Sequence, residues 1–192
     1  MANRVIVIGA GASGMMAALT AAENGAQVML FEKNDRPGKK ILISGKGRCN
    51  VTTDKDTNEI INSFLHNGKF LYTALNSFSN QQVKYFFEEA GVPLKVERGE
   101  RVFPVSDQSK DIVNALRRKL EAAGVDLWLN APVKEVLFAD GRACGVMLPN
   151  GRKIEADCVI VATGGASYPG TGSTGDGYHF ARKAGHNIIP LR

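Results

Sequence analysis

A mostly parallel α/β fold is the class that this sequence predicts, on three observations. An apolar, β-branched run at 4–8 is followed by a glycine-rich turn and a helical stretch at 12–23. A second apolar run at 27–31 completes a βαβ unit of about 30 residues. Asp-Gly at 140–141 and Asn-Gly at 150–151 predict the turns of an antiparallel three-stranded β-meander in a later crossover. Together these features predict a Rossmann-like fold.

The elements of the first half follow from the spacing of apolar residues. The run Val5–Ile8 is typical of a strand buried on both faces of a parallel sheet. The stretch 12–23 lacks proline, and Asn24 and Gly25 favour a helix stop after it. Residues 35–53 are rich in Gly, Lys, Ser and Asn and predict a long loop. A helical excursion is expected over about 55–123, with helices at 57–64, 69–78, 81–90 and 110–123.

The second half predicts further strands and a last helix. A core strand is expected at 125–129 and the β-meander at about 132–156. A closing strand at 158–162 runs into a glycine-rich loop, and a helix follows at 178–184. We expect residues 1–192 to form one incomplete nucleotide-binding domain, with the substrate domain outside this chain.

Composition, charge and cysteine content narrow the class of protein. The 192 residues carry a net charge of +5, which suits an anionic cofactor and does not require nucleic acid. Cys49, Cys144 and Cys158 form no C-x-x-C pair, so no disulfide framework and no metal site is predicted. Cys144 and Cys158 are expected to be apolar filler in strands, and the protein is expected in the reducing cytoplasm. No apolar run approaches the roughly 20 residues that span a membrane.

The turn after the first strand has the nucleotide-binding pattern Gly9-x-Gly11-x-x-Gly14. Gly9 would permit the tight turn, Gly11 would let the backbone approach a pyrophosphate, and Gly14 would let the helix pack closely. The free amides and the dipole of the helix start attract phosphate, and Ser13 could add a hydroxyl donor. The alternative is a plain glycine-rich turn, which the strand-to-helix context disfavours.

Glu32 ends the second predicted strand, about 20 residues beyond the glycines, where an acid can accept hydrogen bonds from ribose hydroxyls. A carboxylate at this position would repel the 2′-phosphate of NADP, so the pattern favours FAD or NAD. The alternative is a solvated acid beside Lys33.

Three features favour FAD over NAD. The loop at 38–50 follows Glu32 closely and carries cations and backbone donors, whereas a plain nucleotide fold has a short connection there. A β-meander in place of a helical crossover is associated with flavin-binding folds. Residues 162–165 lie at the carboxyl end of a parallel strand, where ligands of open α/β sheets bind. We therefore predict bound FAD, with NADH or NADPH as a candidate reductant.

Three motifs carry a specific resemblance over essentially the whole chain. They are GAGASGMMAA from Gly9 to Ala18, SGKGRCNVT from Ser44 to Thr52, and ATGGASYPGTGSTGDG from Ala162 to Gly177. The sequence resembles the bacterial NAD(P)/FAD-dependent flavoproteins described as aminoacetone oxidase-like, some of which are linked to reduction of bile-acid double bonds. The resemblance implies a fold similar to the glutathione-reductase type and, more loosely, to fumarate reductases.

The resemblance also implies roles for individual residues. Gly9, Gly11, Ser13, Gly14 and Glu32 would hold the adenosine diphosphate, while Arg48, Cys49 and Asn50 would approach the flavin. Val133 would face the adenine through its backbone, and Thr163 and Gly164 would lie near the pyrophosphate. The full set of predicted cofactor-binding residues is Gly9, Gly11, Ala12, Ser13, Gly14, Glu32, Lys33, Gly45, Arg48, Cys49, Asn50, Val133, Thr163, Gly164 and Gly165.

The predicted function is that of an FAD-dependent oxidoreductase, which transfers hydride between a nicotinamide or organic substrate and FAD. The partner expected is a small molecule, with neither nucleic acid nor membrane, and no catalytic acid or base is assigned. Two alternatives stay open: an FAD-binding module without turnover, and an FAD-dependent RNA-modifying enzyme. For Cys49 a redox role is open, and so is that of a small residue that packs or contacts the flavin. Asp176 either turns a loop near the ligand or starts a helix.

Overall fold

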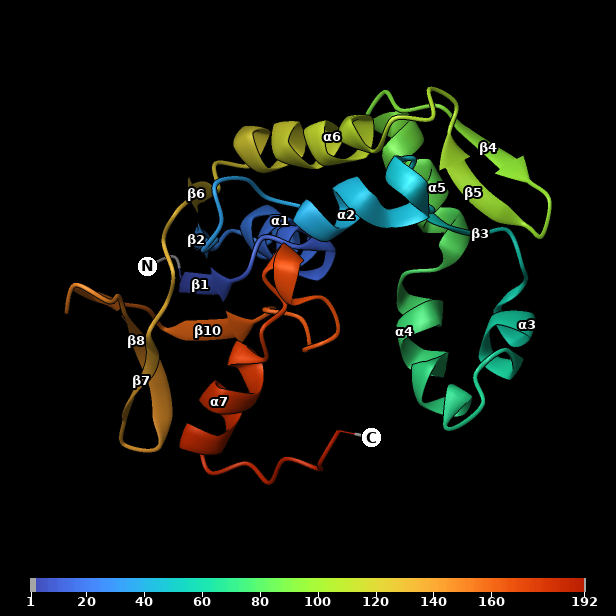
Figure 1. Ribbon diagram of the computed structural model, residues 1–192. Coiled ribbons are helices and arrows are strands. Elements are labelled where there is room, and N and C mark those ends of the chain that lie inside the picture. Colours follow the sequence, from blue (N-terminus) through green and yellow to red (C-terminus); the bar gives the residue numbers. More distant parts are fainter. Residues whose placement is uncertain (1–2, 192) are drawn as a thin grey trace. The chain divides into compact units, whose positions relative to one another are not determined.

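The computed structural model describes residues 3–191 and divides into two compact units. One unit comprises Met1–Lys40 with Leu116–Arg192, and the other comprises Ile41–Ala115. Figure 1 labels most of their helices and strands. The first unit holds two β-sheets and the second unit holds one.

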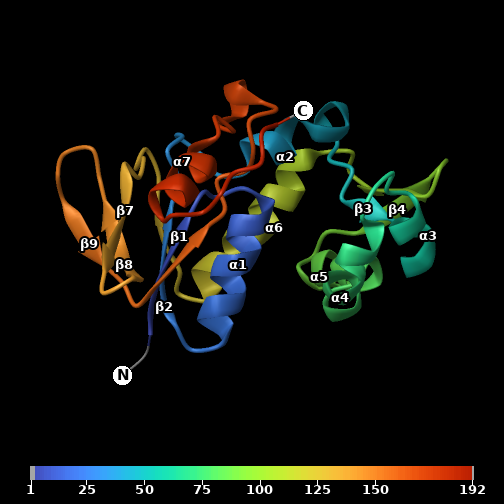
Figure 2. The ribbon, with the colours of Figure 1, turned by 90° about the horizontal axis from the view of Figure 1, so that it is seen from below.

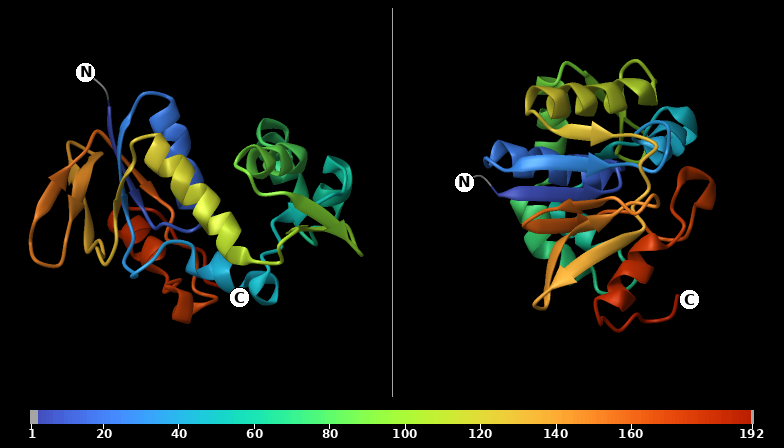
Figure 3. Two further views of the ribbon diagram at one scale, coloured as in Figure 1. Left: turned by 90° about the horizontal axis from the view of Figure 1, so that it is seen from above. Right: turned by 90° about the vertical axis from the view of Figure 1, so that its left-hand side faces the viewer.

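The first unit is built on a four-stranded parallel sheet of order β10-β1-β2-β6. Its arrows point the same way in the right panel of Figure 3. Val7 stands opposite Leu30 on one side and Ile160 on the other, and Ile6 and Val7 are fully buried. This confirms the predicted parallel α/β fold, with the carboxyl ends of the strands at one edge. The strands are β1 (Arg4–Ile8), β2 (Gln27–Phe31), β6 (Asp126–Trp128) and β10 (Cys158–Val161).

Helices and a second sheet cover the two faces of the parallel sheet (Figure 2). Helix α1 (Ala12–Glu23) buries Met15 and Leu19 on one side. On the other side, helix α7 (Asp176–Lys183) contributes Phe180 to a buried cluster that joins Ile8 to the three-stranded meander. The predicted meander is confirmed in antiparallel order β7-β8-β9, with strands β7 (Glu135–Ala139), β8 (Arg142–Met147) and β9 (Lys153–Glu155).

The second unit combines short helices with a three-stranded antiparallel sheet of order β3-β5-β4. Its helices fall where helical spacing predicted them, and capping boxes at Asp56 and Ser79 start two of them. The strands were not predicted, because runs of two to four residues are too short for their apolar pattern to stand out. The elements are β3 (Thr52–Thr53), α3 (Thr57–Asn62), η2 (Gly68–Leu71), α4 (Tyr72–Ser77), α5 (Asn80–Glu89), β4 (Leu94–Glu97) and β5 (Arg101–Pro104).

Three other expectations need correction. The predicted loop at 35–53 contains a short helix, α2 (Lys39–Ile43), and a 3₁₀ turn, η1 (Ser44–Gly47). Cys158 is exposed rather than filler, because β10 is an edge strand of its sheet. Helix α7 begins at Asp176, two residues before the predicted start, so the helix-start interpretation of Asp176 holds.

Helix α6 (Ser109–Ala122) spans the boundary between the two units and begins close to the predicted position. Within residues 3–191, no helix combines the length and the apolar character needed to cross a membrane.

Candidate functional site

The turn between β1 and α1 depends on two glycines that allow close backbone contacts. Gly9 has a φ of +101°, and its N–H donates to the Phe31 carbonyl oxygen at 2.7 Å. A Cβ on Gly9 would lie 2.6 Å from the Ala162 carbonyl oxygen, and one on Gly14 would lie 1.7 Å from the Gly9 carbonyl oxygen. The turn and the close approach of α1 therefore require glycine at both positions.

Gly11 differs from Gly9 and Gly14, because no close contact within the protein requires a glycine at this position. Its φ is −78°, and a Cβ built there meets no atom within 4 Å. Gly11 is the N-cap of α1, with no side-chain cap and no acid in the first turn, and Ala12 and Ser13 are exposed. The first N–H groups of a helix lack intrahelical partners, so this helix end offers donors and a positive dipole to an anion.

Glu32 follows β2 and is buried, with 7% of its surface exposed. Its Oε2 accepts a hydrogen bond from the Ala10 N–H at 2.9 Å. Its Oε1 accepts from the Asn34 N–H at 2.8 Å and from Asn34 Nδ2 at 2.6 Å. This burial contradicts the interpretation of Glu32 as a solvated acid. A carboxylate has about four acceptor positions, and these three donors occupy three of them. Asn34 orients this carboxylate. This role of Asn34 was not predicted, because a single amide residue in a loop belongs to no recognisable motif.

The side chain of Lys33 is bonded within the protein. Lys33 Nζ donates to Thr174 Oγ1 at 2.6 Å and pairs with Asp176 Oδ2 at 2.7 Å. Burial opposes the charge on Asp176, but the hydrogen bonds from Lys33 and Thr174 outweigh it and hold the pKa of Asp176 below its ordinary value. Lys33 therefore connects the end of β2 to the start of α7.

The segments at Val133 and Thr163 also reach this edge of the sheet. The Ala131 N–H donates to the Glu32 carbonyl oxygen at 2.9 Å, and Val133 is half-buried against the core of the unit. Thr163 Oγ1 is buried without a hydrogen-bond partner among the described residues, and it would lie 2.8 Å from a Cβ on Gly177. Since this hydroxyl is turned into the protein, a ligand at Thr163 would be met by its backbone.

The remaining predicted residues lie in the second unit, in the loop at 44–50. Gly45 and Gly47 have φ values of +56° and +85°, and the non-glycine residues Lys46 and Cys49 have φ values of +59° and +64°. A Cβ on Gly45 would lie 2.8 Å from the backbone nitrogen of Asn50, whose side chain is exposed. Left-handed non-glycine residues cost conformational energy and cluster at functional sites.

Cys49 is buried, with 6% of its surface exposed, and its N–H donates to the Ser44 carbonyl oxygen at 3.0 Å. Burial raises the pKa of its thiol above the ordinary value, although a hydrogen bond with Ser44 acts in the opposite direction. A buried thiol with a raised pKa is a poor nucleophile, so the structure favours Cys49 as a small packing or flavin-contacting residue over the redox role.

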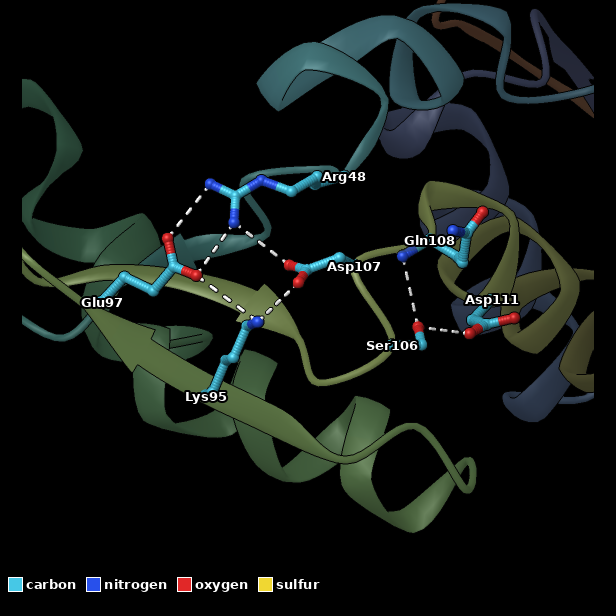
Figure 4. A network of polar contacts seen from close by, with 7 residues as sticks. All are labelled: Arg48, Lys95, Glu97, Ser106, Asp107, Gln108 and Asp111. Atoms are coloured by element: carbon cyan, nitrogen blue, oxygen red, sulfur yellow. Dashed lines mark hydrogen bonds and ion pairs between the residues drawn. The ribbon is translucent and has the colours of Figure 1, made fainter.

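Arg48 lies in a network of charges within the second unit (Figure 4). Its guanidinium binds Glu97 through two contacts of 2.9 and 3.0 Å and Asp107 at 3.1 Å, and it stacks 4.0 Å from the Phe103 ring centroid. Lys95 Nζ joins Asp107 at 2.7 Å and Glu97 at 3.4 Å. Arg48, which was predicted to contact the cofactor, thus binds the carboxylates of Glu97 and Asp107. No pattern in the sequence predicted these contacts.

Acid is expected to weaken this network. Hydrogen bonds from Arg48 and Lys95 hold the pKa values of Glu97 and Asp107 below their ordinary values. Their stabilising effect is therefore complete above the ordinary carboxyl pKa values, from about pH 5 upward, and is lost as the pH falls through the lowered folded pKa values. Urea unfolding between neutral and acidic pH should show a larger loss of stability in the wild type than in Glu97→Gln. Equal pH dependence in the two proteins would contradict the network's role.

No group of three or more His, Cys, Asp or Glu side chains within 3–191 is arranged to hold a metal ion. The first unit thus brings the glycine turn, Glu32, Val133 and the Thr163–Gly165 segment to one edge of the sheet. Ligands of open α/β sheets bind at such an edge.

Comparisons with known proteins agree with this geometry. Residues 3–191 match the family described as HI0933-like protein Rossmann domain. The chain is 35% identical to the 3-dehydro-bile acid delta(4,6)-reductase of Clostridium scindens, over 98% of this chain and 46% of that protein. It is 31% identical to the ribosomal RNA dihydrouridine synthase of Escherichia coli (strain K12), over 97% of this chain and 46% of that protein. The chain therefore spans about half the length of these curated relatives.

A solved structure shows the same fold. The open conformation of a flavocytochrome c3 fumarate reductase superposes on this chain with a TM-score of 0.74 and 27% sequence identity. The match covers 95% of this chain and 40% of the fumarate reductase chain. The expected likeness to fumarate reductases is thereby confirmed at the level of fold.

Proposed function

The chain belongs to the HI0933-like Rossmann domain family, and on that premise we propose that it binds FAD as the nucleotide-binding part of a flavoprotein oxidoreductase. One observation carries the proposal: the helix start at Gly11, open to an anion, lies beside the buried carboxylate of Glu32. Pyrophosphate and ribose are the two groups that such a pair of features recognises.

The residues present fit FAD at several points. Gly11 would lie against the pyrophosphate, together with the first-turn amides of α1 and the exposed Ser13 hydroxyl. Glu32 would accept a ribose hydroxyl. The backbones of Val133 and Thr163 would line the nucleotide. Contacts of Arg48, Cys49 and Asn50 with the flavin ring remain a prediction from the resemblance to aminoacetone oxidase-like proteins.

When bound, FAD supplies the redox chemistry by accepting a hydride and passing on electrons, and the protein's task is to bind and orient it. NADH or NADPH is the proposed reductant, and a small organic molecule is the proposed substrate. Cys49, Cys144 and Cys158 are free thiols, which supports a reducing compartment, the cytoplasm.

Flavin absorbance of the purified protein tests the proposal directly. We expect a yellow protein, or a colourless one that becomes yellow with added FAD, and bleaching by NADH or NADPH under anaerobic conditions. Bound FAD that neither nicotinamide bleaches would favour the binding module without turnover. A chain that cannot be reconstituted with FAD would refute the assignment.

A second function is favoured by two relatives named ribosomal RNA dihydrouridine synthases, 31% and 32% identical to this chain. Under this alternative, a uridine in ribosomal RNA would be the substrate that is reduced. The net charge of +5 is compatible with an RNA partner. Nucleoside analysis of ribosomal RNA from cells with and without the gene decides between the two: loss of dihydrouridine supports the RNA substrate, and an unchanged content supports the small molecule.

Replacing Glu32 with alanine should weaken nucleotide binding and should also lower the stability of the FAD-free protein. FAD affinity is expected to fall by about 1.5–3 kcal/mol, the range for hydrogen bonds to charged groups. The Ala10 N–H also loses its acceptor, so the FAD-free protein should be less stable by about 1–3 kcal/mol. Flavin titration and urea unfolding measure the two effects separately, and unchanged affinity would refute the ribose contact.

A further inference from the structure

Residues 168–176, which include the 3₁₀ helix η3 (Pro169–Thr171) and end at the first residue of α7, lie against the end of β2. We call this segment the clasp loop, and we propose that it retains the bound nucleotide, with Lys33 as its positioning residue. This inference rests on the proposed FAD binding. It assigns to Lys33 a function other than the direct cofactor contact expected from the sequence.

Lys33 fixes the far end of the clasp loop through two residues at once. Its ammonium donates to Thr174 Oγ1 and to Asp176 Oδ2, and Thr174 Oγ1 in turn donates to Asp176 Oδ1 at 2.8 Å. The side chains of Lys33 and Asp176 are 29% and 37% exposed. Such a partly shielded, hydrogen-bonded pair is screened less than an exposed one.

Asn34 and a glycine hold the middle of the clasp loop. Asn34 Nδ2 binds Glu32 and makes a long contact of 3.5 Å with the Thr171 carbonyl oxygen. Gly172 has a φ of +96°, and a Cβ on it would lie 2.6 Å from Asn34 Nδ2 and 3.2 Å from Lys33 Cε. The loop backbone therefore packs directly on these two side chains.

The same loop touches the other strand end of the candidate site. The Gly175 N–H donates to the Gly165 carbonyl oxygen at 3.2 Å, and a Cβ on Gly164 would lie 3.0 Å from the oxygen of the buried Ser173. The clasp loop thus connects the segment after β2 to the segment after β10. Because both segments are proposed to line the nucleotide, opening the loop would loosen both.

Variants that remove the charge of Lys33 or of Asp176 distinguish a positioning role of Lys33 from a direct contact with phosphate. If Lys33 were a phosphate ligand, Asp176→Asn would free its ammonium and preserve or tighten FAD binding. If Lys33 closes the clasp loop, Lys33→Met and Asp176→Asn both remove its ion pair with Asp176, and Lys33→Met also removes its hydrogen bond to Thr174. Both variants should then release FAD faster, and the double variant should be no worse than Lys33→Met alone.

The test measures FAD dissociation and association rates for the wild type, Lys33→Met, Asp176→Asn and the double variant. We expect each variant to release FAD about tenfold faster with little change in association rate, since changes in contacts act mostly on dissociation. Lys33→Arg, which keeps the charge, should recover most of the retention. Arg36→Met is the matched control, because it removes the adjacent exposed ion pair with Asp35 and should leave FAD release unchanged.

Each result has a defined meaning. Unchanged dissociation in Lys33→Met and Asp176→Asn, or tighter binding by Asp176→Asn, would overturn the clasp while leaving FAD binding intact. A wild type that binds no FAD would instead overturn the proposed function. If both charge variants fail to fold by circular dichroism, Thr174→Val, which removes one acceptor of Lys33, should still speed release, and an unchanged rate would refute the clasp.

Discussion

Replacing Gly11 with valine is expected to abolish FAD retention while the chain stays folded. The dissociation constant should rise by about 100-fold or more, equivalent to about 2.8 kcal/mol. The physical reason is that a Cβ at Gly11 meets no protein atom within 4 Å and would instead occupy the space at the start of α1. Flavin titration measures the affinity, and urea unfolding of the FAD-free protein measures the fold.

A size series at this position sharpens the test. Gly11→Ala should bind FAD more weakly than the wild type and more tightly than Gly11→Val. Because Gly11 is the N-cap of α1, both variants should lose about 1 kcal/mol of stability and remain folded. A valine variant with full flavin content would contradict the pyrophosphate position, and one that unfolds would show that Gly11 has a structural role as well.

Replacing Gly14 with alanine is expected to damage the fold itself. The added Cβ would stand 1.7 Å from the Gly9 carbonyl oxygen, and Gly9 is held in place by its hydrogen bond to Phe31. Because backbone must move to relieve this overlap, the free energy of unfolding should fall by about 3 kcal/mol or more, at the upper end of overpacking effects.

Gly11→Ala is the matched control for Gly14→Ala, since it adds the same methyl group three residues earlier in open space. Thermal and urea unfolding of the two FAD-free variants give the comparison. Similar stabilities would show that α1 can shift away from the turn at little cost and would weaken the account of the close packing.

Much of the first unit could be predicted because its signals are local. The strands at 4–8 and 27–31 and the helix at 12–23 were predicted with the bounds observed, since apolar runs and turn residues bracket them. The first turn of the β-meander shows why its Asp-Gly dipeptide predicted a hairpin. Asp140 and Gly141 both have positive φ, at +50° and +73°, as the favoured two-residue hairpin turn requires.

The contacts that the predicted site residues make within each unit could not be predicted, because they join distant residues. Lys33 meets Asp176 across 143 positions, and Arg48 meets Glu97 across 49. Ion pairs of this kind leave no periodicity in the sequence. The left-handed backbone of Cys49 also lacks a signal, since cysteine is not a residue that favours that conformation.

The close backbone packing around Gly9 and Gly14 has a consequence for cofactor engineering. Neither residue accepts a side chain, because one on Gly14 would meet the Gly9 carbonyl oxygen and one on Gly9 would meet the Ala162 carbonyl oxygen. Position 11 is the one glycine of the motif that a designer can vary without rebuilding the scaffold. Attempts to convert the nucleotide preference should therefore combine changes at Gly11 with changes at Glu32, and keep the two flanking glycines fixed.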